Sequence, residues 1–117
     1  MDVKVDVEVP IVRDSDRLDA IGAIGVARCF AFSGAKYRPF YIEDVEPIKD
    51  MTAEQYNKQT LLNKSTAINH FYEKLLLIKE KIQTSTGLKM AEQRHEFMEL
   101  FLKQFELETN PSINNLN

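Results

Sequence analysis

The feature that most restricts the fold of this chain is a nearly apolar run from Ala20 to Phe32, interrupted only by Arg28. The run is well short of the roughly 20 residues that a membrane-spanning helix needs. Its small and large apolar side chains occupy nearly every side of a helix, which is typical of a helix enclosed by neighbouring elements. The sequence therefore predicts a core helix and no membrane anchor.

The ends of this helix are marked by residues that commonly cap helices. Asp14 or Ser15 can accept a backbone N–H at the start, and Gly34 can close the end. Asp16 falls in the first turn, where the helix dipole favours an acid. We therefore expect one continuous helix over about residues 15–33.

Two glycines lie inside this helix, Gly22 and Gly25. Each costs about 1 kcal/mol relative to alanine in a helix interior. We expect the close approach of another helix, or of a substrate, to compensate for that cost.

The N-terminal segment alternates valine with charged residues over 3–9 and is limited by Pro10. This period of two is typical of a strand with one buried face. No second strand is legible in the sequence, and a lone strand has no partner for its backbone groups. An extended N-terminal arm, lying on helices or pairing between subunits, fits the pattern equally well.

The middle of the chain contains a segment without periodicity. Glycine, two prolines and mixed charge over residues 34–51 indicate a long surface loop. Thr52 and Gln55 then have capping-box spacing, which predicts a short helical turn.

Two amphipathic patterns complete the expected fold. Apolar residues recur at steps of three and four over about 66–83 and again over about 88–107, with an interruption at 84–87. The two helices are expected to form an antiparallel hairpin. We assign residues 1–108 to a single helical domain and 109–117 to a disordered tail.

Composition excludes several classes of protein. A chain of 117 residues has the size of one domain, and its net charge of −3 argues against a nucleic-acid partner. The single cysteine, Cys29, cannot form an internal disulfide and is expected to pack inertly in the apolar helix. No signal peptide precedes the first segment, so we expect a cytoplasmic protein.

Three segments resemble a known family. Residues 11–28, IVRDSDRLDAIGAIGVAR, resemble the D-A-D-R-L-D-A-I-G-A-I-G-I-A-R segment of small HD-domain metal-dependent phosphohydrolases, with serine in place of the middle alanine. Residues 65–76 are similar to the S-T-x-I-N-H-F-Y-E-K-L-L helix of that family, and residues 91–98 to its A-x-x-R-H-x-F-M helix. The resemblance runs in order from about residue 7 to 106. It implies an all-α, HD-domain-like helical bundle of the nucleotide pyrophosphatase-like kind.

The resemblance also implies a metal site, of which this sequence contains one part. Family members bind a divalent metal such as Mn or Mg through a histidine, a consecutive His-Asp pair and a distant aspartate. Asp16 occupies the distant position. The two histidines, His70 and His95, are followed by Phe71 and Glu96, so the 117 residues contain no His-Asp pair. We therefore expect the C-terminal portion of an HD fold with an incomplete metal site.

An incomplete donor set has a consequence for catalysis. One carboxylate leaves a divalent ion mostly hydrated, so we expect little activity from the chain alone. If another chain or a longer native protein supplies the missing ligands, the resemblance implies hydrolysis of nucleotide or other phosphate esters and anhydrides. Arg17, Asn69 and Lys74 would then contact phosphate oxygens, Asp19 would orient a water or Arg17, and the 34–51 loop would rim the pocket.

Less specific interpretations stay open for each of these residues. Acids at a helix start are commonly caps, Lys74 on a charged helix is commonly solvated, and His70 and His95 fit packing roles. The whole chain could instead be a non-catalytic helical binding or dimerisation module. An apolar helix at 15–33 without its upstream neighbours would favour a homo-oligomer or a partner chain that covers it.

Overall fold

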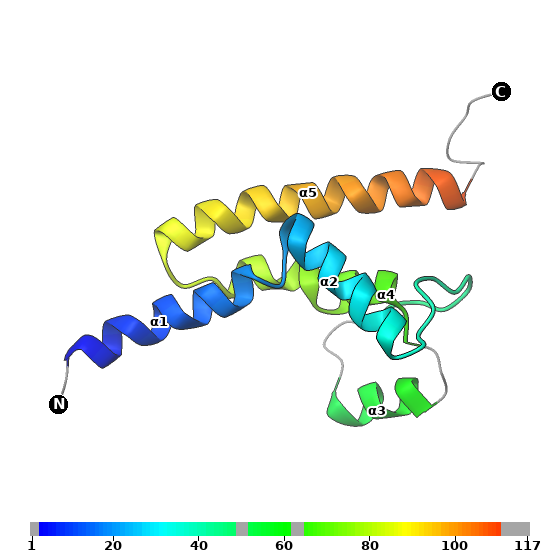
Figure 1. The fold of residues 1–117 in the computed structure, drawn as a ribbon, viewed down its shortest axis with the longest axis horizontal. Coiled ribbons are helices and arrows are strands. Elements are labelled where there is room, and N and C mark those ends of the chain that lie inside the picture. Colours follow the sequence, from blue (N-terminus) through cyan, green and yellow to red (C-terminus); the bar gives the residue numbers. More distant parts are fainter. Residues whose placement is uncertain (1–2, 49–51, 62–64, 111–117) are drawn as a thin grey trace.

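The chain folds entirely into helices wherever the structure describes it. The computed structural model describes residues 3–48, 52–61 and 65–110, and none of these residues forms a strand (Figure 1). The elements are α1 (Val3–Leu18), α2 (Gly22–Ala35), α3 (Ala53–Leu61), α4 (Ala67–Glu73), the short 3-10 helix η1 (Leu75–Lys81) and α5 (Ser85–Thr109). The expected all-α class is confirmed.

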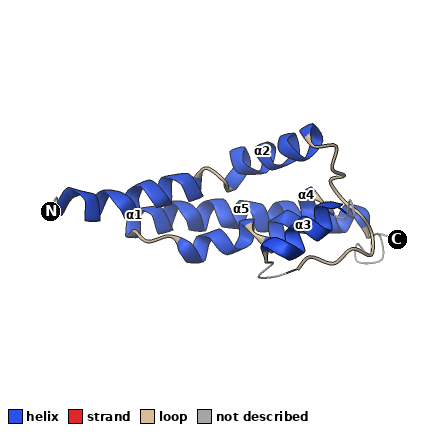
Figure 2. Ribbon diagram, turned by 90° about the horizontal axis from the view of Figure 1, so that it is seen from below, coloured by secondary structure: helices blue, strands red, loops and turns tan. Residues whose placement is uncertain are grey.

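The long helix α5 organises the other elements. α1, α2 and η1 all pack against α5, and α4 packs against η1 and α2 (Figures 1 and 2). α3 stands away from α5, on the far side of α2 and α4 (Figure 1). α4 and η1 pack against each other and together form one layer, the α4–η1 floor.

One apolar cluster joins these helices. Its buried members are Leu18, Ile21 and Val26 near the α1–α2 junction, Ile68 and Phe71 of α4, Leu75 and Ile78 of η1, and Ala91, Met98 and Leu102 of α5. The ring of Phe71 stacks on that of Phe101 with centroids 5.7 Å apart, and Phe30 of α2 contacts both rings at 6.0 and 5.8 Å. These aromatic contacts fix α2 and α4 against α5.

The predicted N-terminal strand or extended arm is wrong. Residues 3–9 belong to α1, and Pro10 lies inside that helix. A strand without a neighbour leaves its backbone N–H and C=O groups unpaired, whereas a helix pairs them within the segment. The absence of a partner strand therefore outweighs the alternation of valine and charge.

The predicted continuous helix over 15–33 is also wrong, because the chain bends by 66° between α1 and α2. Ile21 has an extended backbone, and Gly22 has a φ of +82°, which only glycine adopts readily. At Gly25, an added Cβ would lie 2.4 Å from the carbonyl carbon and oxygen of Ala20. The close approach expected at the glycines is real, but at Gly25 the neighbour is the chain's own bend.

The helix predicted over residues 66–83 is interrupted once. The predicted helix at 66–83 breaks at Lys74, whose φ of −140° lies outside the helical region, and resumes as the 3-10 helix η1. Thr66 caps α4, because its hydroxyl oxygen accepts the backbone N–H of Asn69 at 3.0 Å. The pattern of apolar residues is thus retained while the backbone changes pitch.

Three further helix boundaries can be compared with those predicted from the sequence. The capping box before α3 is confirmed: Gln55 N–H donates to the Thr52 hydroxyl at 3.1 Å, and Thr52 N–H donates to the Gln55 side chain at 2.9 Å. The last helix begins at Ser85 rather than near residue 88, because Thr84 caps it. At the other end α5 includes Thr109, and residues 111–117 of the expected disordered tail lie outside the described residues.

No single described helix is both long and apolar enough to cross a bilayer, although residues 9–18 and 22–35 meet the length and composition requirement when the bent pair is counted together.

Candidate functional site

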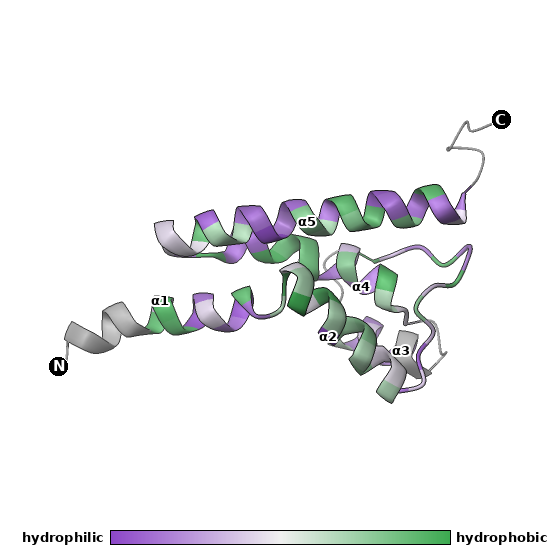
Figure 3. Cartoon of the chain, turned by 45° about the horizontal axis from the view of Figure 1, so that its top comes forward, coloured by the Kyte–Doolittle hydropathy of each residue, from purple (hydrophilic) through white to green (hydrophobic). Residues whose placement is uncertain are grey.

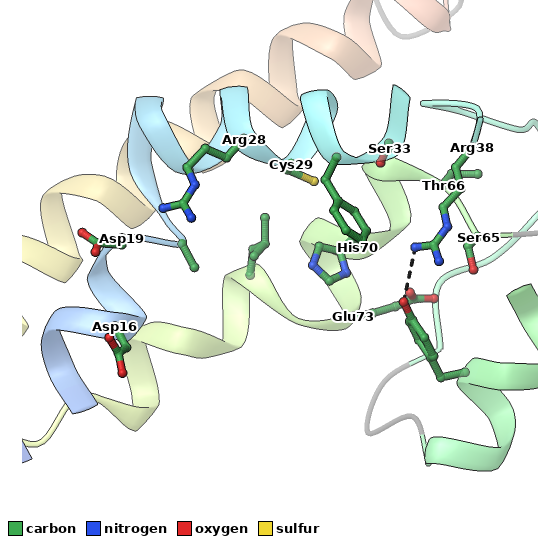
Figure 4. Close-up of a pocket in the computed structure, with 15 residues that line it drawn as sticks. Asp16, Asp19, Arg28, Cys29, Ser33, Arg38, Ser65, Thr66, His70 and Glu73 are labelled. Atoms are coloured by element: carbon green, nitrogen blue, oxygen red, sulfur yellow. Dashed lines mark hydrogen bonds between the residues drawn. The ribbon is translucent and has the colours of Figure 1, made fainter. Parts of the chain in front are cut away.

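A cavity of about 460 Å³ lies between α2 and the α4–η1 floor. Its size is in the usual range for small-molecule sites. The lining residues are Asp16, Asp19, Ala20, Gly25, Arg28, Cys29, Phe32, Ser33, Arg38, Tyr56, Ser65, Thr66, His70, Glu73 and Leu75 (Figure 4). They come from the α1–α2 junction, α2, the following loop, α3 and α4, so segments distant in sequence build this one site.

One end of the cavity is acidic. Asp16, in the last turn of α1, and Asp19, in the turn that follows, lie at this end, and Arg28 of α2 lies near them (Figure 4). Both carboxylates are exposed to solvent. The fold therefore brings Asp16 and Asp19 together at the cavity, as a shared role requires.

These two carboxylates are too few to hold a divalent ion firmly. Among the described residues, no three His, Cys, Asp or Glu side chains are close enough together to form a metal site. A catalytic metal normally has at least three protein ligands. The donor set of the described residues does not fit a complete metal site.

Asp14 has a structural role that its position in sequence conceals. It is buried, and its Oδ1 accepts the N–H of Gln83 at 2.8 Å, while its Oδ2 accepts the N–H and hydroxyl of Thr84 at 2.8 and 2.6 Å. Burial by itself would raise the pKa of Asp14, but these hydrogen bonds, with help from the charge of Arg17, lower it below its ordinary value. Asp14 thus holds the start of α5 rather than capping its own helix.

Three predicted substrate contacts lie outside the cavity lining. The Arg17 guanidinium donates to the carbonyl of Lys81 at 2.7 Å. The Asn69 side chain donates to the carbonyl of Val45 at 2.8 Å and lines a second, smaller cavity. Lys74 is exposed at the junction of α4 and η1. The structure therefore brings only Asp16 and Asp19 of the predicted site residues into the cavity.

The floor of the cavity contributes His70, for which the sequence favoured a packing role, and Glu73, to which the sequence assigned no role. Burial lowers the pKa of His70, and the charges of Lys74 and Arg38 lower it further. Burial raises the pKa of Glu73. The hydrogen bond that its carboxylate accepts from the Ile48 N–H at 3.0 Å lowers this pKa and so partly offsets the effect of burial. His70 is therefore mostly neutral near pH 7, where it can both donate and accept a hydrogen bond.

At the end of the cavity away from Asp16 and Asp19 lies Arg38 (Figure 4), which contacts two aromatic rings. The Arg38 guanidinium donates to the Tyr56 hydroxyl at 3.3 Å, and its central carbon lies 5.8 Å from the Tyr56 ring centroid and 5.4 Å from that of Phe32 (Figure 4). The expectation that the 34–51 loop rims the pocket holds for Arg38. Nothing in the sequence pattern indicated Phe32 or Tyr56 as partners, because they are brought together only by the fold.

Two other residues considered in the sequence, Cys29 and His95, each make a long polar contact. Cys29 lines the cavity, its thiol donates to the carbonyl of Ala67 at 3.8 Å, and burial raises its pKa, which keeps it protonated. His95 lies on α5, away from this cavity, with Nε2 3.4 Å from the Glu99 carboxylate.

The chain was compared in sequence and in structure with known proteins. No protein-family model matches the chain. The uncharacterized protein YpgQ of Bacillus subtilis is 37% identical over 102 residues, which are 87% of this chain and 40% of YpgQ. The crystal structure of YpgQ in complex with ADP has a TM-score of 0.67 at 37% identity and covers 86% of this chain and 44% of that one.

Two other solved structures are similar over the same extent. A Lactobacillus plantarum protein has a TM-score of 0.78 at 42% identity, covering 87% of this chain and 46% of that one. An HD-superfamily hydrolase from Bacillus thuringiensis has a TM-score of 0.71 at 41% identity, covering 89% of this chain and 47% of that one. The chain thus spans less than half the length of these relatives. Over most of its own length, this chain is similar in sequence and in fold to part of an HD-superfamily hydrolase.

Proposed function

We propose that this chain supplies one part of an HD-type, metal-dependent phosphohydrolase site that acts on nucleotide or other phosphate anhydrides or esters. The observation that carries the proposal is the position of Asp16. This acid, which the resemblance assigns as the distant metal ligand, lies with Asp19 at one end of a cavity in a chain 41% identical to an HD-superfamily hydrolase.

We also propose that the chain is inactive alone. Its described donor set does not form a complete metal site, and its sequence contains no His-Asp pair. A second polypeptide segment would have to contribute the histidine and the His-Asp pair. Once complete, such a site would hold a divalent metal such as Mn or Mg, which would supply the activation of water.

The substrate class rests on two supports. The relative YpgQ has been crystallised in complex with ADP. In this chain, Arg28 places a guanidinium at the acidic end of the cavity, where it can bind phosphate oxygens. We assign the phosphate contact to Arg28 in preference to Arg17, because the Arg17 guanidinium already binds the Lys81 carbonyl.

Complementation tests this function. The chain would be mixed with a polypeptide comprising the part of YpgQ that it does not match, and Mn-dependent release of phosphate or pyrophosphate from nucleotides would be measured. We expect release by the mixture and its loss with Asp16→Asn. The matched control is Asp44→Asn, because Asp44 is an exposed acid with a φ of 68°, which asparagine tolerates, and it does not line this cavity.

A second candidate function, a non-catalytic assembly module, is favoured by a different observation. Apolar side chains are exposed along α1 and α2: Val9, Ile11, Val12, Ile24 and Phe32. Much of α2 has the colour of hydrophobic residues in Figure 3. Ile24 is 73% exposed and Phe32 is 52% exposed. A surface of this kind commonly marks an interface with another protein or a second copy. If the chain binds the complementing polypeptide but the mixture shows no metal-dependent hydrolysis, the assembly module is favoured over the hydrolase.

A further inference from the structure

Two hydroxyl groups are buried where α2 passes the start of α4. Ser33, near the end of α2, is 6% exposed, and Thr66, directly before α4, is 5% exposed; both line the cavity. The helices are close here, because the thiol of Cys29, one turn before Ser33, lies 3.8 Å from the carbonyl oxygen of Ala67. His70, one turn after Thr66, also lines the cavity. The fold thus gathers Ser33, Thr66 and His70 between α2 and α4 (Figure 4).

These three side chains keep hydrogen-bonding groups that the fold leaves unused. Within the described part of the chain, the Ser33 hydroxyl and the His70 imidazole have no hydrogen-bond partner. The Thr66 oxygen accepts the Asn69 N–H at 3.0 Å, and its own O–H has no acceptor. Among the described side chains, the one fully enclosed polar atom without a partner is Nδ1 of His95, so the groups of Ser33 and His70 stay accessible from the cavity. A ligand that accepts hydrogen bonds would offset the cost of burying these donors.

The charges around His70 favour an anion. Lys74 and Arg38, both cations, are the charged groups that shift the pKa of its imidazole. Each would attract an oxyanion bound beside the ring. Glu73 lines the cavity as well, but its carboxylate accepts the Ile48 N–H at 3.0 Å and is not among the groups that shift this pKa.

The acidic end of the cavity is less suitable for an oxyanion. Asp16 and Asp19 both lie there with exposed carboxylates, whereas Arg28 brings a single guanidinium. Two negative charges outweigh one positive charge, so this end repels an anion until a cation of the completed site offsets the carboxylates. Figure 4 shows the His70 ring away from both acids, on the side of Ser33. The chain alone therefore has its better anion site at His70.

We infer that the Ser33 hydroxyl, the Thr66 hydroxyl and the His70 imidazole form a subsite for an oxyanion of the phosphate type. Both hydroxyls and the ring N–H would donate to anionic oxygens, and hydrogen bonds of this kind are among the stronger ones in proteins. Arg38 keeps its contact with the Tyr56 hydroxyl and contributes only its charge. Oxyanion binding at this subsite requires no metal and no second segment.

The subsite also narrows the substrate class. As a place for part of the substrate it rests on the proposed function, in which another phosphate meets Arg28. A substrate that reaches both Arg28 and His70 carries at least two anionic groups. A phosphate anhydride meets this requirement, whereas a monoester with an uncharged remainder does not.

Sulfate is a suitable probe, because it is an oxyanion whose charge is constant around neutral pH. It would be titrated into the full chain at constant ionic strength, with chloride as the balancing anion. The NMR signals of the His70 imidazole and of the backbone amides of residues 29–33 and 66–70 should shift and saturate. The imidazole of His95, which does not line the cavity, should not respond. Inorganic phosphate should compete with sulfate, and ribose, a neutral polyhydroxyl compound, should not.

Three variants make the result specific. Ser33→Ala removes one donor and should weaken sulfate binding by at least about tenfold, as for one hydrogen bond to a charged group. Ser15→Ala is the matched control, since Ser15 is an exposed helical serine outside the cavity lining, and should leave the affinity unchanged. His70→Gln keeps an N–H donor and should bind sulfate more tightly than His70→Leu, a contrast that a purely structural role would not produce. Circular dichroism shows whether each variant is folded.

The outcomes separate the subsite from the proposed function. No saturable sulfate binding, or equal affinity in wild type, Ser33→Ala and both His70 variants, would overturn the subsite. Binding of ribose that depends on Ser33 would also overturn it, because the same groups would then serve a neutral ligand. Sulfate binding that depends on Ser33, without hydrolysis by the complemented chain, would contradict the proposed function and leave the subsite in place.

Discussion

At the scale of single residues, the three acids within residues 14–19 lie in different surroundings. Asp14 is buried and holds the start of α5, whereas Asp16 and Asp19 lie exposed at the cavity. In the sequence, all three look like acids at the start of a helix, so the sequence does not distinguish their roles. Asp14 accepts hydrogen bonds from the 83–84 segment that precedes α5, whereas Asp16, two residues further along α1, lines the cavity.

Removing the Asp14 carboxylate should destabilise the chain. Asp14→Asn replaces one acceptor oxygen with an amide N–H₂ that faces backbone donors, so we expect the free energy of unfolding to fall by about 1–3 kcal/mol. Chemical denaturation monitored by circular dichroism measures the loss. Ser15→Asn, at the exposed neighbouring position, should change the stability by less than about 0.5 kcal/mol.

The contribution of Asp14 should depend on pH. Because its pKa is lowered in the folded chain, its stabilisation is fully present above the unfolded carboxyl pKa of about 4 and is lost as the pH falls through the folded pKa. The stability difference between wild type and Asp14→Asn should be constant from about pH 5 to 7 and shrink below about pH 4. A difference that grows on acidification would contradict the hydrogen-bond assignment.

At the scale of elements, the sequence identified most helices but not where they break. The apolar period marked the helices near 66–83 and 88–107, because burial of one face acts over a whole element. The bend at residues 19–21 left no comparable signal, since Ile21 and Gly22 fit an apolar helix equally well by hydropathy. The N-terminal segment was misassigned because alternation alone says nothing about whether a partner strand exists.

The candidate site shows the same division. Asp16 and Asp19 stand out in the sequence as acids near the start of the predicted apolar helix, the resemblance assigns a metal role to Asp16, and both residues line the cavity. Arg38 and Tyr56 are 18 residues apart and meet only through the folded path of the chain. Such contacts between segments carry no local pattern, so a single sequence could not reveal the Arg38–Tyr56 contact.

Packing at the start of α5 can be tested with two glycines. In Gly87→Ala the new Cβ would lie 2.7 Å from both Asp14 Oδ2 and Thr84 Oγ1, so the cap must shift, and we expect a loss of about 1–3 kcal/mol. In Gly34→Ala nothing lies within 4 Å of the new Cβ, and the helical position should gain about 0.5–1 kcal/mol. Thermal unfolding of both variants measures the contrast. Equal effects would show that Gly87 does not contact the cap.

At the scale of the whole molecule, apolar exposure and an incomplete donor set occur together. Two of the exposed apolar residues, Val12 of α1 and Ile24 of α2, lie in sequence on either side of the segment that contains Asp16 and Asp19. A partner seated on this face would cover it and lie close to the acidic end of the cavity. The assembly module and the composite hydrolase therefore predict contact at the same surface.

Association through this surface should be lost when a charge is added to it. Ile24→Glu places a carboxylate on the 73% exposed position of α2, so an oligomer or complex that covers this face should dissociate. Sedimentation velocity measures the change in mass. Leu100→Glu, on the 62% exposed position of α5, is the control and should leave the mass unchanged. Dissociation by the control alone would move the interface to α5.

The central claim is that the chain brings Asp16 to a metal-dependent site that a second segment completes. The most direct measurement is Mn-dependent hydrolysis of ADP by the chain alone, by the complementing segment alone and by their mixture, each with wild-type Asp16 and with Asp16→Asn. The account predicts activity only in the mixture with wild-type Asp16. Metal-dependent hydrolysis by the isolated chain, or activity of the mixture that survives Asp16→Asn, would contradict it.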